Sequence, residues 1–128
     1  MKGLLERQQL GEIKEIYHLA CPASPKAYQK DPHRTFWTAV NGSRIVLEIG
    51  RRKGARVVMA STSEIYADPL EHPQKECYYG NVSTVGPRAC YDEGKRGMEA
   101  LGWIYATRYG VDVRVVRLFN VYGEGMLS

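Results

Sequence analysis

The chain has 128 residues, of which 44% are hydrophobic and 25% charged, and its net charge is +4 at pH 7. This composition is typical of a folded globular domain with one modest core, and it argues against an intrinsically disordered chain. The basic residues are dispersed, and their one short run, residues 51–53, precedes Gly54 at an expected helix end. The charge therefore does not indicate a nucleic-acid partner.

Cysteine content and hydropathy exclude further classes. The three cysteines are far apart and match no metal-ligand spacing, so we expect no metal site and no disulfide framework. Residues 1–9 contain no apolar stretch of signal-peptide length, and no window approaches the ~20 apolar residues of a membrane span. We expect a soluble chain in a reducing compartment, with no membrane partner.

The first half of the chain predicts one strand and one helix. Residues 15–20 form a short strand-like run, and the prolines at positions 22 and 25 predict that a loop follows it. Residues 34–53 carry apolar side chains at mostly helical spacing, and Gly54 supplies a C-terminal stop. This pattern predicts a helix over residues 34–53.

The second half predicts a strand, a long loop, a helix and a strand. Residues 55–60 are a nearly continuous apolar run, typical of a strand that is covered on both faces of a parallel sheet. Residues 65–88 are rich in proline and glycine, and a loop of this length is expected to carry function. Helical spacing over residues 91–109 ends at Gly110, and a third apolar run follows at residues 111–119.

Strands that alternate with helices predict right-handed crossovers and a parallel sheet with helices on its faces. Ligands of such sheets lie beyond the carboxyl ends of the strands. The polar clusters at residues 21–28, 61–66 and 120–123 each follow a predicted strand. We therefore expect these clusters to meet at one edge of the sheet.

Tyr91 and Lys95 are four residues apart in a predicted helix, so they share one face. An ammonium close to a phenol favours the phenolate and lowers the pKa of the phenol, which suits proton transfer. The strand end at residues 61–63, Ser-Thr-Ser, could supply a hydroxyl beside that phenol. Alone, this spacing is as typical of a half-exposed surface pair.

Three blocks, at residues 16–25, 60–69 and 86–96, together resemble the UDP-glucuronate decarboxylase family of the extended short-chain dehydrogenase/reductase superfamily. The resemblance covers about residues 16–123. It implies an α/β, Rossmann-like parallel sheet with flanking helices, a tightly held NAD, and conversion of a UDP-sugar, UDP-glucuronate, to UDP-xylose and CO₂ through a 4-keto intermediate. A related nucleotide-sugar 4-epimerase or 4,6-dehydratase is the enzymatic alternative. A non-catalytic fragment that associates with an intact homologue is the other.

The resemblance also implies roles for particular residues. Tyr91 would remove the proton of the C4 hydroxyl, Lys95 would assist it, and Thr62 would orient the C4 oxygen, while Ser63 and Glu64 match further catalytic positions. Glu64 after Ser63 favours a decarboxylase, because similar dehydratases usually carry Asp-Glu at these positions and epimerases generally lack the glutamate. The implied cofactor contacts are Leu19, Ala20, Tyr91 and Lys95, and the implied substrate contacts are Ser24, Pro25, Tyr28, Arg88 and Asn120.

Some family features are not found in the sequence. A dinucleotide fold uses a GxGxxG-type turn after its first strand, and none occurs before Ile16. We therefore expect residues 1–128 to be one partial domain that lacks the first βαβ half and the C-terminal substrate domain. A homodimer is expected for full-length relatives. The expected compartment is the cytoplasm, with a Golgi anchor in a longer N-terminus as the alternative.

Overall fold

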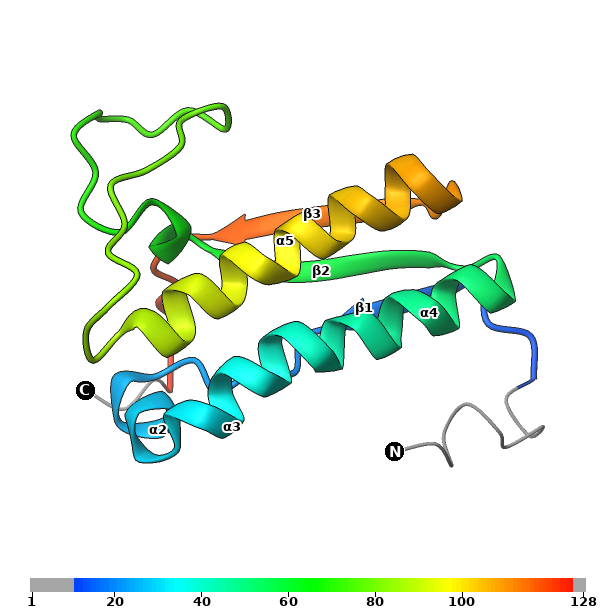
Figure 1. Ribbon diagram of the computed structural model, residues 1–128, viewed down its shortest axis with the longest axis horizontal. Coiled ribbons are helices and arrows are strands. Elements are labelled where there is room, and N and C mark those ends of the chain that lie inside the picture. The colour runs from blue at the N-terminus through cyan, green and yellow to red at the C-terminus, as the bar shows by residue number, and fades with distance from the viewer. Residues whose placement is uncertain (1–10, 126–128) are drawn as a thin grey trace.

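The computed structural model describes residues 11–125 and contains a three-stranded sheet with helices packed against it (Figure 1). All strand pairs are parallel, in the order β1-β2-β3. The predicted α/β class and the alternation of strands and helices are confirmed. The polar N-terminal segment, residues 1–9, lies outside the described residues. The elements, in chain order, are β1 (Glu15–His18), α2 (Pro25–Lys30), α3 (Pro32–Trp37), the π-helix η1 (Thr38–Gly42), α4 (Ser43–Lys53), β2 (Arg56–Thr62), the 3₁₀-helix η2 (Ser63–Tyr66), α5 (Ala89–Tyr109) and β3 (Val113–Leu118).

Glycines end the two long helices where the sequence predicts it. Gly54 follows α4 with φ 63° and Gly110 follows α5 with φ 66°, the left-handed conformation that glycine adopts without steric cost. Each helix then turns directly into a strand beside the previous one. The carboxyl ends of all strands therefore meet at one edge of the sheet.

The core lies between the sheet and the pair α4 and α5. Its fully or nearly buried members come from both layers: Leu47, Val57, Met59, Met98, Tyr105 and Val111. In β2 the fully buried positions alternate with partly exposed ones until the strand end. The prediction that β2 is covered on both faces is wrong for the described residues, because α4 and α5 pack on the same face of the sheet (Figure 1). On the neighbouring strand β3, Val116 and Leu118 remain 44% and 46% exposed.

Two corrections concern the segment between β1 and β2. The proline-rich loop contains the helix α2, because Pro25 occupies its first turn, where no backbone donor is needed, and Ser24 caps it. The helix predicted over residues 34–53 begins at Pro32 and is divided by the π-helical turn Thr38–Gly42. A proline and an aspartate cap start the helix earlier than the apolar spacing suggests.

The long loop that follows η2 projects beyond the end of β2 (Figure 1). Its return is fixed by an isolated bridge between Ala67 and Asn81 and by Arg96, which donates to the carbonyl oxygens of Ile65 and Tyr79 at 2.8 and 3.0 Å. The loop starts and ends near the carboxyl edge of the sheet, so it frames the region where the polar clusters meet.

Candidate active site

A cavity of about 270 Å³ lies at the carboxyl ends of β2 and β3. It combines the end of β2, the start of α5, the chain after β3 and the start of α2. Most of the predicted catalytic and substrate residues line it. The lining residues are Ala23, Pro25, Tyr28, Thr62, Ser63, Glu64, Arg88, Tyr91, Leu118, Phe119 and Asn120.

Tyr91 lies in the first turn of α5 and is 6% exposed. Its hydroxyl lies beside Thr62, whose side-chain hydrogen bond lowers the pKa of Tyr91, but burial is the larger effect and raises this pKa above its usual value. The spatial expectation for Tyr91 and Thr62 is therefore confirmed. The expected direction of the pKa shift is wrong, because desolvation of the phenolate outweighs the favourable contacts.

Lys95 lies one turn further along α5 and is 5% exposed. Its Nζ donates to the carbonyl oxygen of Ala60 at 2.6 Å and lies 5.9 Å from the centre of the Tyr91 ring. Burial lowers the pKa of Lys95. Burial thus disfavours the phenolate and the ammonium alike, and forming the two charges side by side would offset part of both penalties.

Tyr28 is stacked on Tyr91, with ring centroids 5.0 Å apart and planes inclined by 8°. Tyr28 is only 2% exposed, and it reaches Tyr91 because α2 runs beside the start of α5. The stacking holds the ring that carries the candidate base. The family resemblance implies that Tyr28 contacts the substrate, and it did not predict the stacking of Tyr28 on Tyr91.

Charged side chains surround the N-terminus of α5. Arg88 forms an ion pair with Glu64, and its Nε lies 3.7 Å from the Asp92 carboxylate. Asp92 is 6% exposed, its Oδ1 has no hydrogen-bond partner among the described residues, and burial raises its pKa. Arg88 thus compensates two carboxylates, one of which lines the cavity.

Four predicted residues do not line this cavity: Lys95, described above, and Leu19, Ala20 and Ser24. Leu19 is 68% exposed at the end of β1, and Ala20 lines a neighbouring cavity of about 640 Å³. Ser24 accepts a hydrogen bond from the amide of Ala27 as the cap of α2. The structure therefore gives Ser24 a structural contact and places the predicted cofactor strand end beside the Tyr91 cavity.

His18 is a site neighbour that the sequence reasoning did not single out. It is 6% exposed, and its Nε2 is hydrogen-bonded to Ser43 Oγ at 2.9 Å. Burial lowers the pKa of His18, and the nearby charge of Lys95 acts in the same direction. Its place as the last residue of β1, three positions before the polar cluster at residues 21–28, was the available signal.

Comparisons with known proteins identify the family of the chain. Residues 5–127 match the NAD dependent epimerase/dehydratase family. The chain belongs to this family. Within residues 11–125, no group of His, Cys, Asp or Glu is placed to hold a metal ion, and no helix is long and apolar enough to cross a membrane.

Curated relatives of this epimerase/dehydratase chain are UDP-glucuronic acid decarboxylases. Over 115 residues, 90% of the chain, it is 54% identical to UDP-glucuronic acid decarboxylase 1 of Arabidopsis thaliana and 50% identical to its namesake from Danio rerio. These matches cover 26% and 28% of the two relatives, so the chain spans about a quarter of their length.

Among solved structures, the dTDP-glucose 4,6-dehydratase DesIV from Streptomyces venezuelae, crystallised with NAD, superposes with a TM-score of 0.79 at 29% identity. The superposition covers 97% of this chain and 37% of DesIV. The Rossmann-like class of the sheet is thereby confirmed.

Proposed function

We propose that this chain forms the catalytic segment of a UDP-glucuronate decarboxylase. The observation that carries the proposal is that Thr62, Ser63, Glu64 and Tyr91 line one cavity in a chain that is 54% identical to such an enzyme over 115 residues. A cofactor-linked decarboxylase needs a base at the sugar hydroxyl and polar groups near the carboxylate, and this set supplies both.

The residues around Tyr91 fit a nicotinamide dinucleotide. Lys95 is a buried ammonium with three donors, one of which is used by Ala60, and none of the ion pairs within residues 11–125 includes it. Such a cation is stabilised by accepting oxygens of a bound molecule. In this proposal Lys95 and Tyr91, with the strand end at Leu19 and Ala20, hold NAD. NAD supplies a hydride acceptor for sugar C4 when bound.

The remaining roles follow from the cavity. Tyr91 takes the proton of the C4 hydroxyl as the carbonyl forms, and Thr62 orients that oxygen. Oxidation at C4 places a ketone β to the carboxylate, so the C5–C6 bond breaks, CO₂ leaves, and the electrons of that bond remain on the sugar as an enolate. Ser63 and Glu64 lie where they can assist this step and the following protonation at C5. The C4 ketone is then reduced again as the hydride returns to C4 and Tyr91 returns its proton to the C4 oxygen, which gives UDP-xylose. Arg88 and Asn120 line the same space and offer donors to the anionic substrate.

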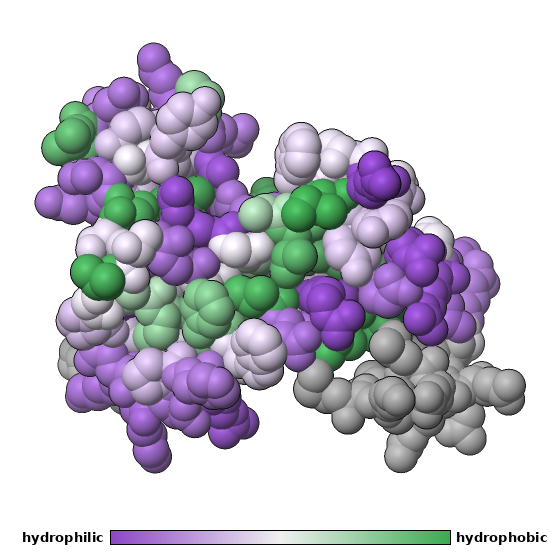
Figure 2. Space-filling view, viewed as in Figure 1, coloured by the Kyte–Doolittle hydropathy of each residue, from purple (hydrophilic) through white to green (hydrophobic). Residues whose placement is uncertain are grey.

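Two further attributes are part of the proposal. The face of the molecule that carries the helices shows a band of apolar residues across its middle (Figure 2). Exposed side chains on α3 and α5, such as Trp37 at 55% and Trp103 at 70%, support a homodimer formed through these helices. We place the activity in the cytoplasm.

A chimera tests the proposal. The 115 matched residues of the Arabidopsis relative are replaced by those of this chain, and products are followed by NMR with UDP-glucuronate. We expect UDP-xylose and CO₂. A chimera that releases only the C4 epimer of the substrate would favour the epimerase alternative, and a chimera that binds NAD and UDP-glucuronate without turnover would contradict the proposed activity.

In this chimera, Tyr91→Phe should lower kcat by about 10²- to 10⁴-fold with little change in KM, because the phenol moves a proton in the transition state. Tyr79→Phe is the control, since Tyr79 is 90% exposed and does not line the Tyr91 cavity. Undiminished UDP-xylose formation by the Tyr91→Phe chimera would refute the role of this phenol.

A further inference from the structure

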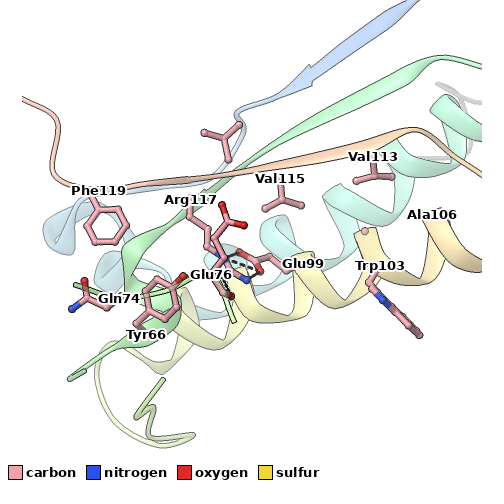
Figure 3. A pocket seen from close by; sticks show the side chains of 12 residues that line it. Tyr66, Gln74, Glu76, Glu99, Trp103, Ala106, Val113, Val115, Arg117 and Phe119 are labelled. Atoms are coloured by element: carbon pink, nitrogen blue, oxygen red, sulfur yellow. Dashed lines mark hydrogen bonds and ion pairs between the residues drawn. The ribbon is translucent and has the colours of Figure 1, made fainter. Parts of the chain in front are cut away.

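A further cavity, of about 770 Å³, lies between α5 and β3 and is larger than the two described above. Figure 3 shows Arg117 and Glu99 in its wall, pointing toward one another from β3 and α5. Neither residue lines the Tyr91 cavity. Their contacts nevertheless reach the segment that carries Thr62, Ser63 and Glu64.

The Arg117–Glu99 pair is joined by parallel hydrogen bonds. Arg117 Nε donates to Glu99 Oε1 at 3.1 Å, and Nη2 donates to Oε2 at 2.8 Å. The two side chains are 26% and 16% exposed. A two-pronged, half-buried pair fixes direction as well as distance, unlike an exposed ion pair, which contributes little.

The same pair holds both ends of the Thr62–Glu64 segment. Ser61 donates its hydroxyl to Glu99 Oε1 at 2.5 Å, directly before Thr62. Arg117 Nη1 donates to the Tyr66 hydroxyl at 2.7 Å, at the end of η2. Ser61 and Tyr66 are each 3% exposed, so water competes little with either contact.

The helix relates this network to Tyr91. Glu99 lies eight residues after Tyr91 on α5, which is about 12 Å along the axis, and α5 is one unbroken helix over Ala89–Tyr109. The same helix therefore carries the candidate base, Tyr91, and Glu99, which anchors the Thr62–Glu64 segment opposite that base. Displacement of that anchor would move Thr62 relative to the Tyr91 hydroxyl.

We propose that Glu99 and Arg117 are positioning residues, which fix the Thr62–Glu64 segment against Tyr91 by holding Ser61 and Tyr66. The catalytic consequence rests on the proposed function. The ordering of the Thr62–Glu64 segment does not depend on the proposed function, and it can be measured in this chain without an activity assay.

The first measurement is amide hydrogen exchange in the 128-residue chain. Glu99→Gln keeps the size of the side chain but removes the charge that pairs with Arg117. We expect exchange at Glu64 and Ala67 to accelerate by roughly 10-fold or more, because their amides bond within the anchored segment, to Thr62 Oγ1 and to the Glu64 carbonyl. Glu48→Gln is the matched control, since Glu48 is 14% exposed and pairs with Arg51 and Arg52 on α4.

Single-contact variants keep the test valid if Glu99→Gln unfolds the chain. Ser61→Ala and Tyr66→Phe each remove one hydroxyl and leave the Arg117–Glu99 pair intact. Each should accelerate amide exchange in the Thr62–Glu64 segment. Arg117→Lys keeps the positive charge but not the fork of donors, so it should retain only part of the protection that arginine gives. Unchanged exchange at Glu64 and Ala67 in all folded variants would overturn the proposal.

The second measurement is turnover in the chimera. Glu99→Gln in the chimera should displace Thr62 and thereby lower kcat by roughly 10- to 100-fold, with KM changed less than about 2-fold. A purely structural pair would lower the unfolding temperature and leave kcat of the folded enzyme unchanged, which would overturn the positioning role. If the unmutated chimera forms no UDP-xylose, the proposed function fails, while hydrogen exchange still decides the positioning of the segment.

Discussion

Tyr28 stacks on Tyr91 with nearly parallel rings, and this contact restricts the orientation of the candidate base. Tyr28→Leu should therefore lower kcat of the chimera by roughly 10-fold, since it removes a ring that contributes about 0.5–1.5 kcal/mol beyond its buried area. Tyr28→Phe keeps the ring and should retain most of the activity. If Tyr28→Leu raised only KM, Tyr28 would be the substrate contact that the sequence resemblance implies.

Asp92 should make stability depend on pH in a defined direction. Burial raises its folded-state pKa above 3.8, so the folded state holds the proton more tightly than the unfolded state. The stability advantage of the wild type over Asp92→Asn should be greatest below about pH 3.8, the unfolded-state pKa, and should be lost as the pH rises through the folded-state pKa. Urea unfolding between about pH 3.5 and 7 measures the difference.

Asp112→Asn provides a control of opposite sign. Its hydrogen bond from Arg56 lowers the pKa of Asp112, so its stabilising contribution is present above pH 3.8 and is lost as the pH falls through the lowered value. Parallel pH profiles for the two variants would contradict the assignment of Asp92 as a carboxylate destabilised by burial.

Much of the site could be predicted only with the family resemblance. The four-residue separation of Tyr91 and Lys95 and the polar end of β2 indicated that Tyr91 and Thr62 could lie together, as the structure shows, but this spacing alone is as typical of a surface pair. The stacking of Tyr28 was not predictable, because it depends on α2, and a Ser-Pro pair is as typical of a turn as of a helix start. The Arg117–Glu99 pair depends on which side of β3 faces α5, and an open opposite face weakens that signal.

Helix packing against the sheet depends on glycine at one position of α4. A Cβ at Gly50 would overlap Val57 Cγ2, a fully buried core atom of β2. Gly50→Ala should lower the free energy of unfolding by about 1–3 kcal/mol, because α4 must move away from the sheet. Thermal or urea unfolding of the purified chain measures this change.

Gly42→Ala is the matched control for Gly50→Ala. Gly42 has helical dihedral angles, and the nearest atom to an added Cβ is Thr38 Cγ2 at 3.9 Å. Its replacement should raise the free energy of unfolding by about 0.5–1 kcal/mol through better helix propensity. Equal destabilisation by both variants would show that space at Gly50 is not the cause.

Element order was predictable, but element boundaries were less so. Apolar periodicity and the stops at Gly54 and Gly110 correctly placed the strands and the long helices. The π-helical turn was not predicted from the apolar spacing. Ser43, directly after the turn, donates its hydroxyl to the carbonyl oxygen of Ala39 within it, and the same hydroxyl is hydrogen-bonded to His18 of β1, a tertiary contact that local spacing does not reveal. The coverage of β2 was mispredicted because a continuous apolar run does not specify how many layers surround it.

The sheet of the described residues is covered by helices on one face, and the sequence contains no glycine-rich turn of the GxGxxG type. That turn supplies the amides and the helix N-terminus that hold a pyrophosphate. We therefore expect the 128-residue chain to show no measurable NAD binding by calorimetry and no decarboxylation of UDP-glucuronate. The chimera serves as the positive control. Micromolar NAD affinity of the isolated chain would contradict this prediction.

The π-helical turn Thr38–Gly42 makes the molecule unequally tolerant of insertions and deletions. Removal of one residue there would restore a regular helix but rotate everything before it by about 100° relative to α4. Thr35 and Ala39, each 1% exposed, would leave the side of α5, and the helices that bring Tyr28 to Tyr91 would turn with them. A deletion in the loop at residues 68–79 would shorten a connection without rephasing any helix. Length variation among descendants of this chain should therefore accumulate in that loop, while the spacing between Tyr28 and Ser43 stays constant.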